Sequence, residues 1–404
     1  MGQTRRNRRI YFGWWLVAGL FIVLTISSGM GFYNLSVYIN VLSQAHGFAV
    51  SEVSGAVSLF FLVGGIGGMW VARLFERMDV RLVMTGGAAL GGLALALIGG
   101  VRESWQLYVL FALFGIGNSG VSIVTSTTLV TRWFPGPDRS VALSVASTGL
   151  SFGGVVLTPV SAAWLNTAGV ETTMPWLGFL FFAAITPIAW LLVRWEPTER
   201  TIEGAVPLPS GPVWYYRDAI RTPFFLVVSL GFVLCMCAQV GGIAHLYNQA
   251  QMIAGDVTAA RAVQILSVMS IVMRIAGGWI VRRMSLRHFA LVNSLVQGAG
   301  VLIIALADSA TTVLVGAAVF GSSVGNLLML HPLMLAEVFG TFDYARIFSL
   351  SNAITVLGVG SGPFMLGLVY DFSSYQVAFG VAAILCLGSF LLMALARVPE
   401  VSSQ

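Results

Sequence analysis

Long apolar runs dominate the sequence, and short polar or charged breaks separate them. Each run is about as long as the roughly 20 residues that a membrane-spanning helix needs. The runs lack the strict alternation that is typical of barrel strands. Reading from break to break predicts twelve spanning helices, and the pattern therefore predicts an all-α membrane protein. The approximate bounds of the predicted spans are 11–42, 51–75, 82–101, 105–131, 140–165, 173–193, 223–253, 257–283, 289–307, 311–337, 345–370 and 374–396.

One break is much longer than the others and divides these helices into two sets of six. It is rich in Pro, Glu and Arg. We expect an N-terminal six-helix bundle at 1–193, a cytoplasmic linker at 194–222 and a C-terminal six-helix bundle at 223–404.

The two sets of helices repeat two of their segments. The pattern Arg-Met-x-(Val/Leu)-Arg occurs at 77–81 and at 283–287, and Gly/Pro-rich stretches occur at 153–159 and 358–363. Transporters often build two pseudo-symmetric bundles around a midplane site from such repeats. The repeats therefore predict two pseudo-symmetric six-helix bundles.

Composition agrees with a chain surrounded by lipid. Mean hydropathy is +0.88 and only 9% of the residues are charged, against about 25% in soluble domains. The remaining polar surface is too small for a water-soluble protein, so we expect the lipid bilayer as the main partner. We find no motif for ATP hydrolysis, no metal-spaced cluster and no catalytic triad, and we expect neither an enzyme nor a cofactor.

The arginines orient the helices. With the N-terminus placed inside, the inner segments hold 18 of the 21 arginines and the outer loops hold Arg102 and Arg261. This alternation follows the positive-inside rule, and it explains the net charge of +5 without a nucleic-acid partner. We expect an integral protein of a prokaryotic cytoplasmic (inner) membrane with both termini in the cytoplasm.

The loop after the second predicted helix resembles a known family signature. Glu76, Arg77 and Arg81 match the inner loop 2–3 pattern of the major facilitator superfamily, G-x-x-x-D-R-x-G-x-R, with Ala72 and Asp79 in place of the two glycines. The resemblance implies the major facilitator fold and secondary transport by alternating access, in which the two bundles rock around a central site.

Further stretches resemble the monocarboxylate porter and oxalate:formate antiporter branch of that superfamily. They are the run 142–159, Phe339-Gly340, Gly362-Pro363 and Leu368-Val-Tyr-Asp371. The branch implies a small organic anion, similar to a monocarboxylate, as the substrate, and a functional monomer is the family expectation. The family also implies that the inner-loop charges hold one side shut. We therefore expect gating by Glu76, Arg77, Arg81, Arg282, Arg283 and Arg287, with plain positive-inside topology as the alternative.

Arg274 is the most informative single residue, because it lies about eight residues from the inner end of the eighth predicted helix, well inside the span. An arginine at the centre of a spanning helix costs about 2.5–3.5 kcal/mol on insertion scales. No carboxylate lies deep in any predicted span, so a carboxylate substrate could supply the missing charge. Arg274-Ile-Ala-Gly-Gly-Trp also resembles the helix 8 stretch whose arginine binds substrate carboxylate in the porter branch. Snorkelling to the inner surface is the alternative.

Five other polar residues are candidates for substrate binding: Tyr33, Asn34, Asn118, His245 and His331. Tyr33 and Asn34 belong to Gly31-Phe-Tyr-Asn34, which resembles the family's helix 1 Gly-Phe stretch, and His245-Leu246 resembles its helix 7 His-Leu. Each of these side chains can instead hydrogen-bond between helices, and each histidine can instead carry a proton.

Two departures from the branch bear on the substrate. Animal monocarboxylate carriers have a lysine where this chain has Asn34, and an acid where it has Ser270. A single cation then faces the substrate, which favours a monoanion. The coupling partner is a proton, a counter-anion or the substrate gradient alone. The alternatives for function are a carrier or exporter of a neutral or drug-like solute with a structural Arg274, and a non-transporting membrane sensor.

Overall fold

The computed structural model describes residues 12–75, 77–134, 138–194, 214–281, 283–340 and 342–399. All regular structure in these ranges is helical. The elements are α1 (Phe12–Ser28), the π-helical turn η1 (Gly29–Tyr33), α2 (Leu35–His46), α3 (Val50–Leu74), α4 (Val80–Ile98), α5 (Ser104–Ser119), α6 (Ile123–Trp133), α7 (Arg139–Ala168), α8 (Val170–Leu192), α9 (Tyr216–Ala219), α10 (Pro223–Ile280), α11 (Leu286–Ala305), α12 (Ala310–Phe339), α13 (Tyr344–Phe372) and α14 (Tyr375–Leu395).

The described residues contain twelve membrane spans, as the hydrophobic pattern predicts. Eleven helices are long and apolar enough to cross a membrane. One of them, the 58-residue α10, leaves helical geometry at Ala254 and at Gly255, whose φ is 77°. Glycine adopts this left-handed region without a Cβ penalty, so α10 bends there and contributes two spans. The predicted break between 253 and 257 is confirmed.

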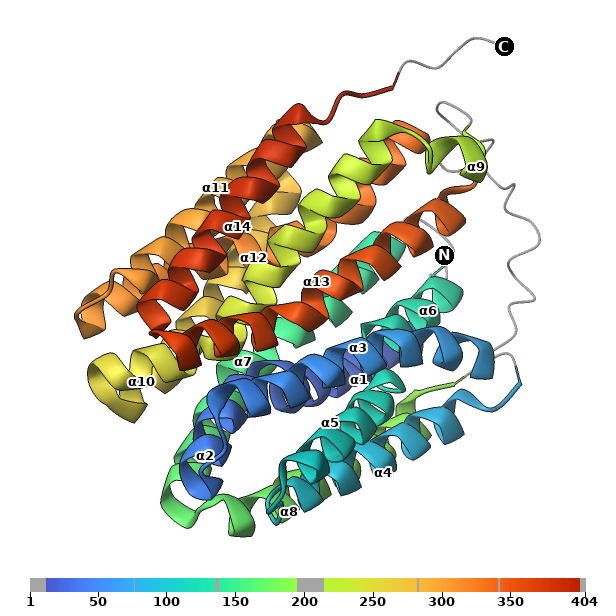
Figure 1. Cartoon of the computed structure of the whole chain (residues 1–404). Coiled ribbons are helices and arrows are strands. Elements are labelled where there is room, and N and C mark those ends of the chain that lie inside the picture. The colour runs from blue at the N-terminus through green and yellow to red at the C-terminus, as the bar shows by residue number, and fades with distance from the viewer. Residues whose placement is uncertain are drawn as a thin grey trace, which may run out of the picture.

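The spans form two bundles of six helices, which confirms the predicted fold class (Figure 1). In this view α4, α5 and α8 lie at the bottom and α11, α12 and α14 at the upper left, and α13 runs between these two groups. The first span comprises α1, η1 and α2, and the fourth comprises α5 and α6. Short helix α9 lies at the predicted linker's C-terminal end, where the Tyr216 backbone N–H donates to the Asp343 carboxylate at 2.9 Å.

Two glycines bring α7 directly onto the backbone of α1. A Cβ added to Gly149 would lie 2.3 Å from the Phe21 carbonyl oxygen, and one added to Gly153 would lie 2.4 Å from that of Thr25. Real Cβ atoms do not approach this closely. Because lipid removes the hydrophobic drive between helices, such close backbone packing is a main source of their association.

The second half repeats this contact with different residues. A Cβ on Gly358 of α13 would lie 2.2 Å from the Val233 carbonyl oxygen, and one on Gly362 would lie 2.3 Å from that of Cys237. Both carbonyl groups belong to the first part of α10. The Gly/Pro-rich stretches singled out in the sequence are therefore equivalent packing faces in the two halves.

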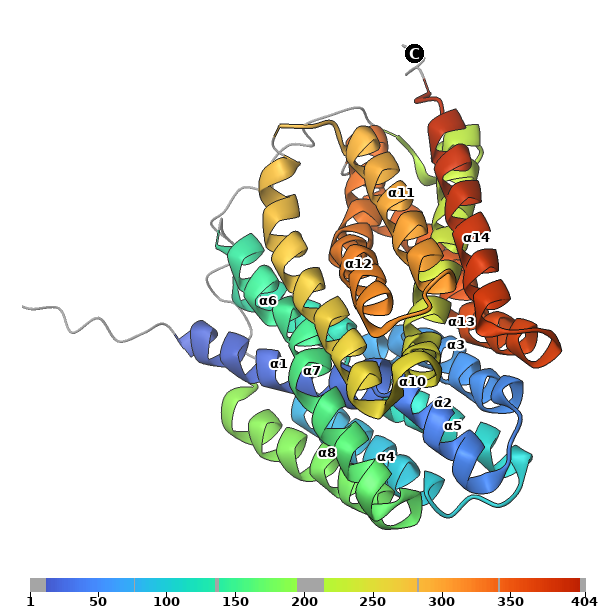
Figure 2. The ribbon, with the colours of Figure 1, turned by 90° about the vertical axis from the view of Figure 1, so that its left-hand side faces the viewer.

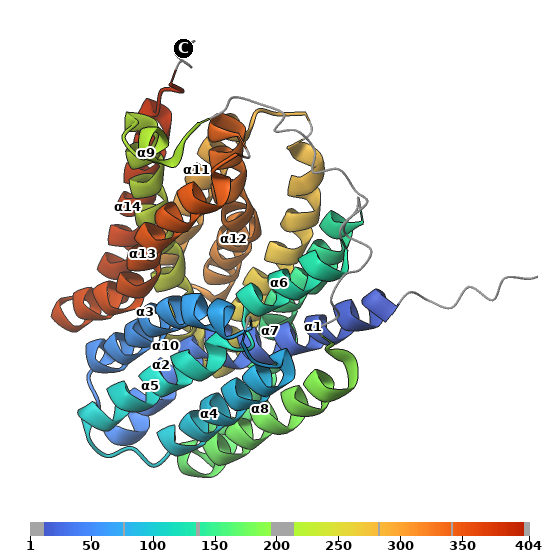
Figure 3. The same ribbon diagram turned by 90° about the vertical axis from the view of Figure 1, so that its right-hand side faces the viewer.

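The halves meet along two lines of helices, α3 with α13 and α7 with α10 (Figures 2 and 3). We use inner and outer for the orientation that the arginines predict. At the outer ends, the Ser51 backbone N–H donates to the Asp371 carboxylate at 2.9 Å, and the Asn40 amide donates to Gln251 at 2.7 Å. Asp371 therefore places a negative charge at the N-terminus of α3, where the helix dipole favours it.

The inner ends are arranged differently. Helix α6, the inner part of the fourth span, packs on α1, α3 and α7, which belong to its own half. Helix α12 likewise packs on α10, α11 and α13. The outer side is thus closed by contacts between the halves, while α6 and α12 pack within their own halves.

We predict that Asp371→Ala shifts the protein towards an outward-open state. Removing the carboxylate takes away a cap at the α3 N-terminus, worth about 0.5–2 kcal/mol, and a charge there, worth about 0.3–1 kcal/mol. Spin labels are attached at Thr167→Cys of α7 and Thr311→Cys of α12. Pulsed electron paramagnetic resonance then measures the distance between these outer helix ends. The population with a long separation should increase several-fold. Asp308→Ala is the matched control, and an equal shift in that variant would contradict the prediction.

Candidate substrate site

Arg274 lies where the two halves meet. Its side chain leaves α10 less than two turns before the helix ends at Ile280. The Nη1 group donates to the Ser147 carbonyl oxygen of α7 at 3.1 Å. The Nε group is buried and has no hydrogen-bond partner. The guanidinium therefore joins the two halves through one nitrogen and keeps another donor available.

Tyr33 lies beside this arginine, as the last residue of η1, and is 3% exposed. Its hydroxyl faces those of Ser151, Ser267 and Ser270, and it is within electrostatic reach of the Arg274 charge. The Ser151 and Ser270 hydroxyls are 3.2 Å apart. We call these five residues the Arg274 cluster.

Glycines on both sides make room for the cluster. A Cβ on Gly154 of α7 would lie 2.1 Å from the Ser267 hydroxyl and 2.8 Å from Cγ of Tyr33. A Cβ on Gly325 of α12 would lie 2.5 Å from the Ser270 carbonyl oxygen. Larger residues at either glycine would push the helices apart, so the sequence fixes how closely η1, α7, α10 and α12 approach one another here.

No carboxylate of the described residues forms an ion pair with Arg274, and Tyr33 is the one neighbour whose charge state bears on it. A buried guanidinium has five N–H donors, and a buried donor without a partner costs about 1–3 kcal/mol. The chain therefore presents a cation with spare donor capacity among hydroxyl groups that come from both halves. This arrangement suits the binding of a small anion with hydrogen-bonding oxygens.

Asn34 follows Tyr33 directly but turns away from the cluster. It is fully buried, its Nδ2 donates to the Tyr38 hydroxyl at 3.4 Å, and its Oδ1 has no partner. The backbone N–H of Asn34 reaches back five residues to the Gly29 carbonyl oxygen at 3.0 Å. This π-type bond inserts an extra residue into the first span, a feature often found at functional sites, and it sets the direction of Tyr33.

Asn118 lies between helices of the N-terminal half. Its Oδ1 accepts from the Ser27 hydroxyl at 3.0 Å, and the side chain packs against Gly31. The structure does not bring Asn118 to the Arg274 cluster. Its contacts fit the alternative role, a hydrogen bond between the first and fourth spans.

His245 lies on the outer side of the cluster and is fully buried. Its Nε2 is 2.9 Å from the Pro363 carbonyl oxygen and 3.3 Å from the Ser54 hydroxyl, and its Nδ1 is 3.3 Å from the Tyr375 hydroxyl. The imidazole thereby joins α10 to α13, α14 and, across the halves, α3. Its partners lie in the outer region, where contacts between the halves close the protein.

His331 lies within the C-terminal half. Its Nε2 is 2.7 Å from the Ser351 hydroxyl, which is itself 2.7 Å from that of Ser229. The ring packs on Phe232 with centroids 4.5 Å apart. These contacts join α12, α13 and α10, and they do not reach Arg274.

The predicted gating residues contact their own halves in this conformation. Arg81, at the start of α4, donates from Nε to the Val193 carbonyl oxygen at the end of α8, at 2.8 Å. Arg287, at the start of α11, donates from Nη2 to the Ala394 carbonyl oxygen at the end of α14. The two residues are equivalent in the sequence repeat, and each caps the last span of its own half.

The other predicted gating residues differ in how far the structure describes them. Arg77 is exposed in the turn between α3 and α4, and the Arg283 guanidinium lies 4.2 Å from the Trp279 ring centroid. Glu76 and Arg282 lie outside the described residues. Gating by these six residues stays a prediction.

Sequence reasoning missed the serines of the cluster. Ser267, Ser270 and Arg274 are spaced by three and four residues, which places them on one helix face. Ser147 and Ser151 are four apart on α7. This spacing could have identified a polar face on α10 and another on α7. What the sequence could not show is that the two faces lie opposite each other.

Comparison with known proteins agrees with this architecture. The family model described as Major Facilitator Superfamily matches residues 21–334. A mutant of the nucleoside transporter NupG has a TM-score of 0.76 at 11% identity, over 95% of this chain and 100% of that chain. An inward-facing, occupied bacterial homologue of the human lysosomal transporter Spinster has a TM-score of 0.68 at 14% identity, over 94% of this chain and 96% of that chain.

Curated relatives match over shorter stretches. "Probable anion transporter 4, chloroplastic" of Arabidopsis thaliana is 32% identical over 41% of this chain and 30% of its own length. The Bacillus subtilis "Uncharacterized MFS-type transporter YcxA" is 27% identical over 43% of each chain. The chain thus spans less than half of the length of these relatives. Because the family model covers well over half of the chain, the protein belongs to the Major Facilitator Superfamily.

Proposed function

We propose that this transporter carries a small organic monoanion, similar to a monocarboxylate, across the membrane by alternating access. Two properties of the buried Arg274 guanidinium carry the proposal. Its Nε has no hydrogen-bond partner, and no carboxylate of the described residues neutralises its charge. The anion transporter named among the relatives adds support.

The geometry of the guanidinium suggests how the anion binds. A carboxylate can accept from Nε and from one Nη nitrogen together, as a bidentate pair. The nearby hydroxyl groups of Tyr33 and Ser270 can donate to oxygens of the same ligand. A single cation balances a single negative charge, so a monoanion leaves no excess charge in the low-dielectric site.

The same contact can couple binding to movement. Arg274 belongs to the C-terminal half, and its protein partner, the Ser147 carbonyl oxygen, belongs to the N-terminal half. An anion that takes over donors of the guanidinium changes the strength of this contact between the halves. Closing the inner side then brings the predicted gating arginines towards the opposite half. The driving partner is a proton, a counter-anion or the substrate gradient itself.

One observation favours a second candidate, a carrier or exporter of a neutral or drug-like solute. Arg274 already donates to Ser147, and a structural arginine would need such a bond. The two candidates differ in whether the charge of residue 274 affects transport, and a membrane sensor differs from both because it binds a ligand without moving it.

We predict that Arg274→Gln abolishes uptake of a labelled monocarboxylate into proteoliposomes. Truncating one partner of a buried charge pair costs about 2–5 kcal/mol, which weakens binding at least about thirtyfold. Arg274→Lys should keep part of the activity, because it retains the charge and loses the planar fork. Arg261→Gln, on the outer part of the same helix, is the control.

The outcomes separate the candidates. Monoanion uptake that is unchanged in Arg274→Gln would refute the proposal. Uptake of neutral solutes by both proteins would establish the second candidate. Thermal stabilisation of the wild-type protein by monocarboxylates without any flux would indicate a sensor.

We also predict that Tyr33→Phe weakens binding of the monoanion about two- to tenfold, because one hydrogen bond contributes about 0.5–1.5 kcal/mol. Tyr38→Phe is a matched control, since Tyr38 is equally buried but its hydroxyl faces Asn34. Binding is measured as the ligand-induced rise in the thermal unfolding temperature. Equal effects of the two substitutions would remove Tyr33 from the site.

A further inference from the structure

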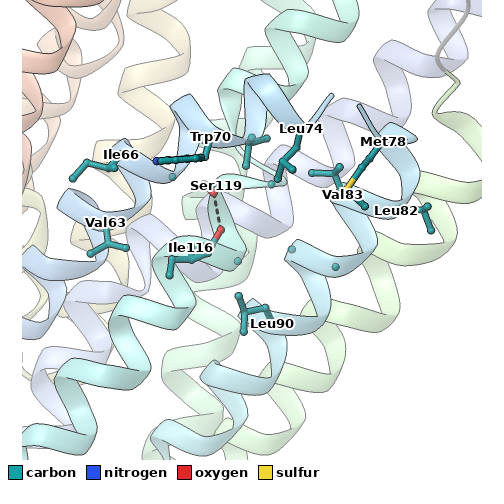
Figure 4. A pocket seen from close by; sticks show the side chains of 16 residues that line it. Val63, Ile66, Trp70, Leu74, Met78, Leu82, Val83, Leu90, Ile116 and Ser119 are labelled. Carbon is teal, nitrogen blue, oxygen red and sulfur yellow. Dashed lines mark hydrogen bonds between the residues drawn. The ribbon is translucent and has the colours of Figure 1, made fainter. Parts of the chain in front are cut away.

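An apolar groove lies on the N-terminal bundle between α3 and α4 (Figure 4), and none of its lining residues belongs to the Arg274 cluster. Helices α3 and α4 both pack extensively on α5 but touch each other little. Between them they leave a volume of about 510 Å³. Its walls carry Ile66, Trp70 and Leu74 from α3, with Leu82 and Leu90 from α4, and its floor is α5.

Glycines keep the groove open. A Cβ added to Gly117 of α5 would lie 2.3 Å from the Gly91 backbone nitrogen of α4. The two helices therefore touch through their backbones, and side chains do not fill the space above them. Gly86, which lines the groove, has no heavy atom within 4 Å of an added Cβ. On the α3 side, Trp70 is 62% exposed.

The length of the groove corresponds to one leaflet of a bilayer. It extends along α3 from Val63 to Leu74, which is about 17 Å at 1.5 Å per residue. Half of the hydrocarbon core of a typical bilayer is about 15 Å. The groove runs from the middle of the span to its inner end, so it can hold one acyl chain of the inner leaflet.

The inner mouth of the groove has a net positive charge, because the segment 73–81 holds three arginines against Glu76 and Asp79. The Arg73 guanidinium lies 5.6 Å from the Trp70 ring centroid, and Arg77 is exposed in the adjoining turn. The carboxylate of Asp79 caps α4 by accepting from the Arg81 backbone N–H at 2.9 Å. Clusters of basic residues at this depth attract anionic headgroups. Each basic residue in such a cluster raises the affinity about fivefold.

A second groove shows what the arginines add. Helices α11 and α14 enclose about 610 Å³ lined by residues such as Leu295, Leu302, Gly380 and Leu387. This groove lies towards the outer side. The lining residues of both grooves are uncharged, but the segments 303–310 and 372–377 at the outer end of the second groove contain no arginine. It offers an apolar surface of similar size without a site for a headgroup.

We propose that the groove between α3 and α4 is a binding site for an anionic phospholipid of the inner leaflet. One acyl chain lies along Trp70 and Gly86, and the phosphate is held by Arg73 and Arg77. The site is separate from the substrate site, and it does not depend on which solute the transporter carries.

The test compares lipids that differ only in their headgroup. Native mass spectrometry of the full-length protein in detergent measures binding of phosphatidylglycerol and of phosphatidylcholine with identical acyl chains. We expect the wild-type protein to bind one phosphatidylglycerol at least about tenfold more tightly than phosphatidylcholine. Soluble glycerol phosphate at the same concentration should not displace it, because glycerol phosphate has no acyl chain.

Variants separate the headgroup from the acyl chain. Arg73→Gln combined with Arg77→Gln should remove the preference between the two lipids, and Arg102→Gln on the outer side should not. Gly86→Leu should fill the groove and weaken the binding of both lipids, whereas Gly380→Leu in the second groove should leave the preference intact. Gly380 also has no heavy atom within 4 Å of an added Cβ, so the two leucines are matched.

Three results would overturn the proposal. They are equal affinity of the wild-type protein for the two lipids, a preference that survives loss of both arginines, and displacement of the lipid by glycerol phosphate. If Gly86→Leu does not fold, the arginine variants decide the question alone.

Discussion

Backbone contact through glycine is the interaction on which the rest of this structure depends. Gly149 and Gly153 hold α7 against α1, and Gly358 and Gly362 hold α13 against α10. Lipid gives no hydrophobic drive for helices to associate, so close packing must hold each bundle together. Because α7 and α13 also form the surfaces where the halves meet, each half can move as a rigid unit that carries its side of the interface with it.

The proposed substrate site depends on that rigidity. Arg274 and Ser270 come from one half, Tyr33 and Ser151 from the other, and the cluster exists only while the halves approach each other. The contacts at Asp371 and His245 lie farther out and close the opposite side. A ligand held at Arg274 would thus lie between a closed outer region and inner segments that pack within their own halves, as alternating access requires.

Much of the fold could be predicted from the sequence. The thickness of the bilayer sets the length of each apolar run, and the positive-inside rule sets the placement of arginine. Arg274 stood out because its cost in lipid is large. The serines around it did not, since a serine within a span is common and its partner depends on how two distant helices face each other. For the same reason the sequence could not show that His245 and His331 contact Pro363 and Ser351.

Arg81 and Arg287 also affect how the two halves are connected. Each arginine ties the C-terminal end of its bundle's last span to the start of that bundle's third, through the Val193 and Ala394 carbonyl groups. The chain continues from Val193 straight into the connecting segment. Each bundle therefore fastens its own last span to its third span, while the described ends of the connecting segment add further contacts, between Arg194 and Trp133 and between Tyr216 and Asp343.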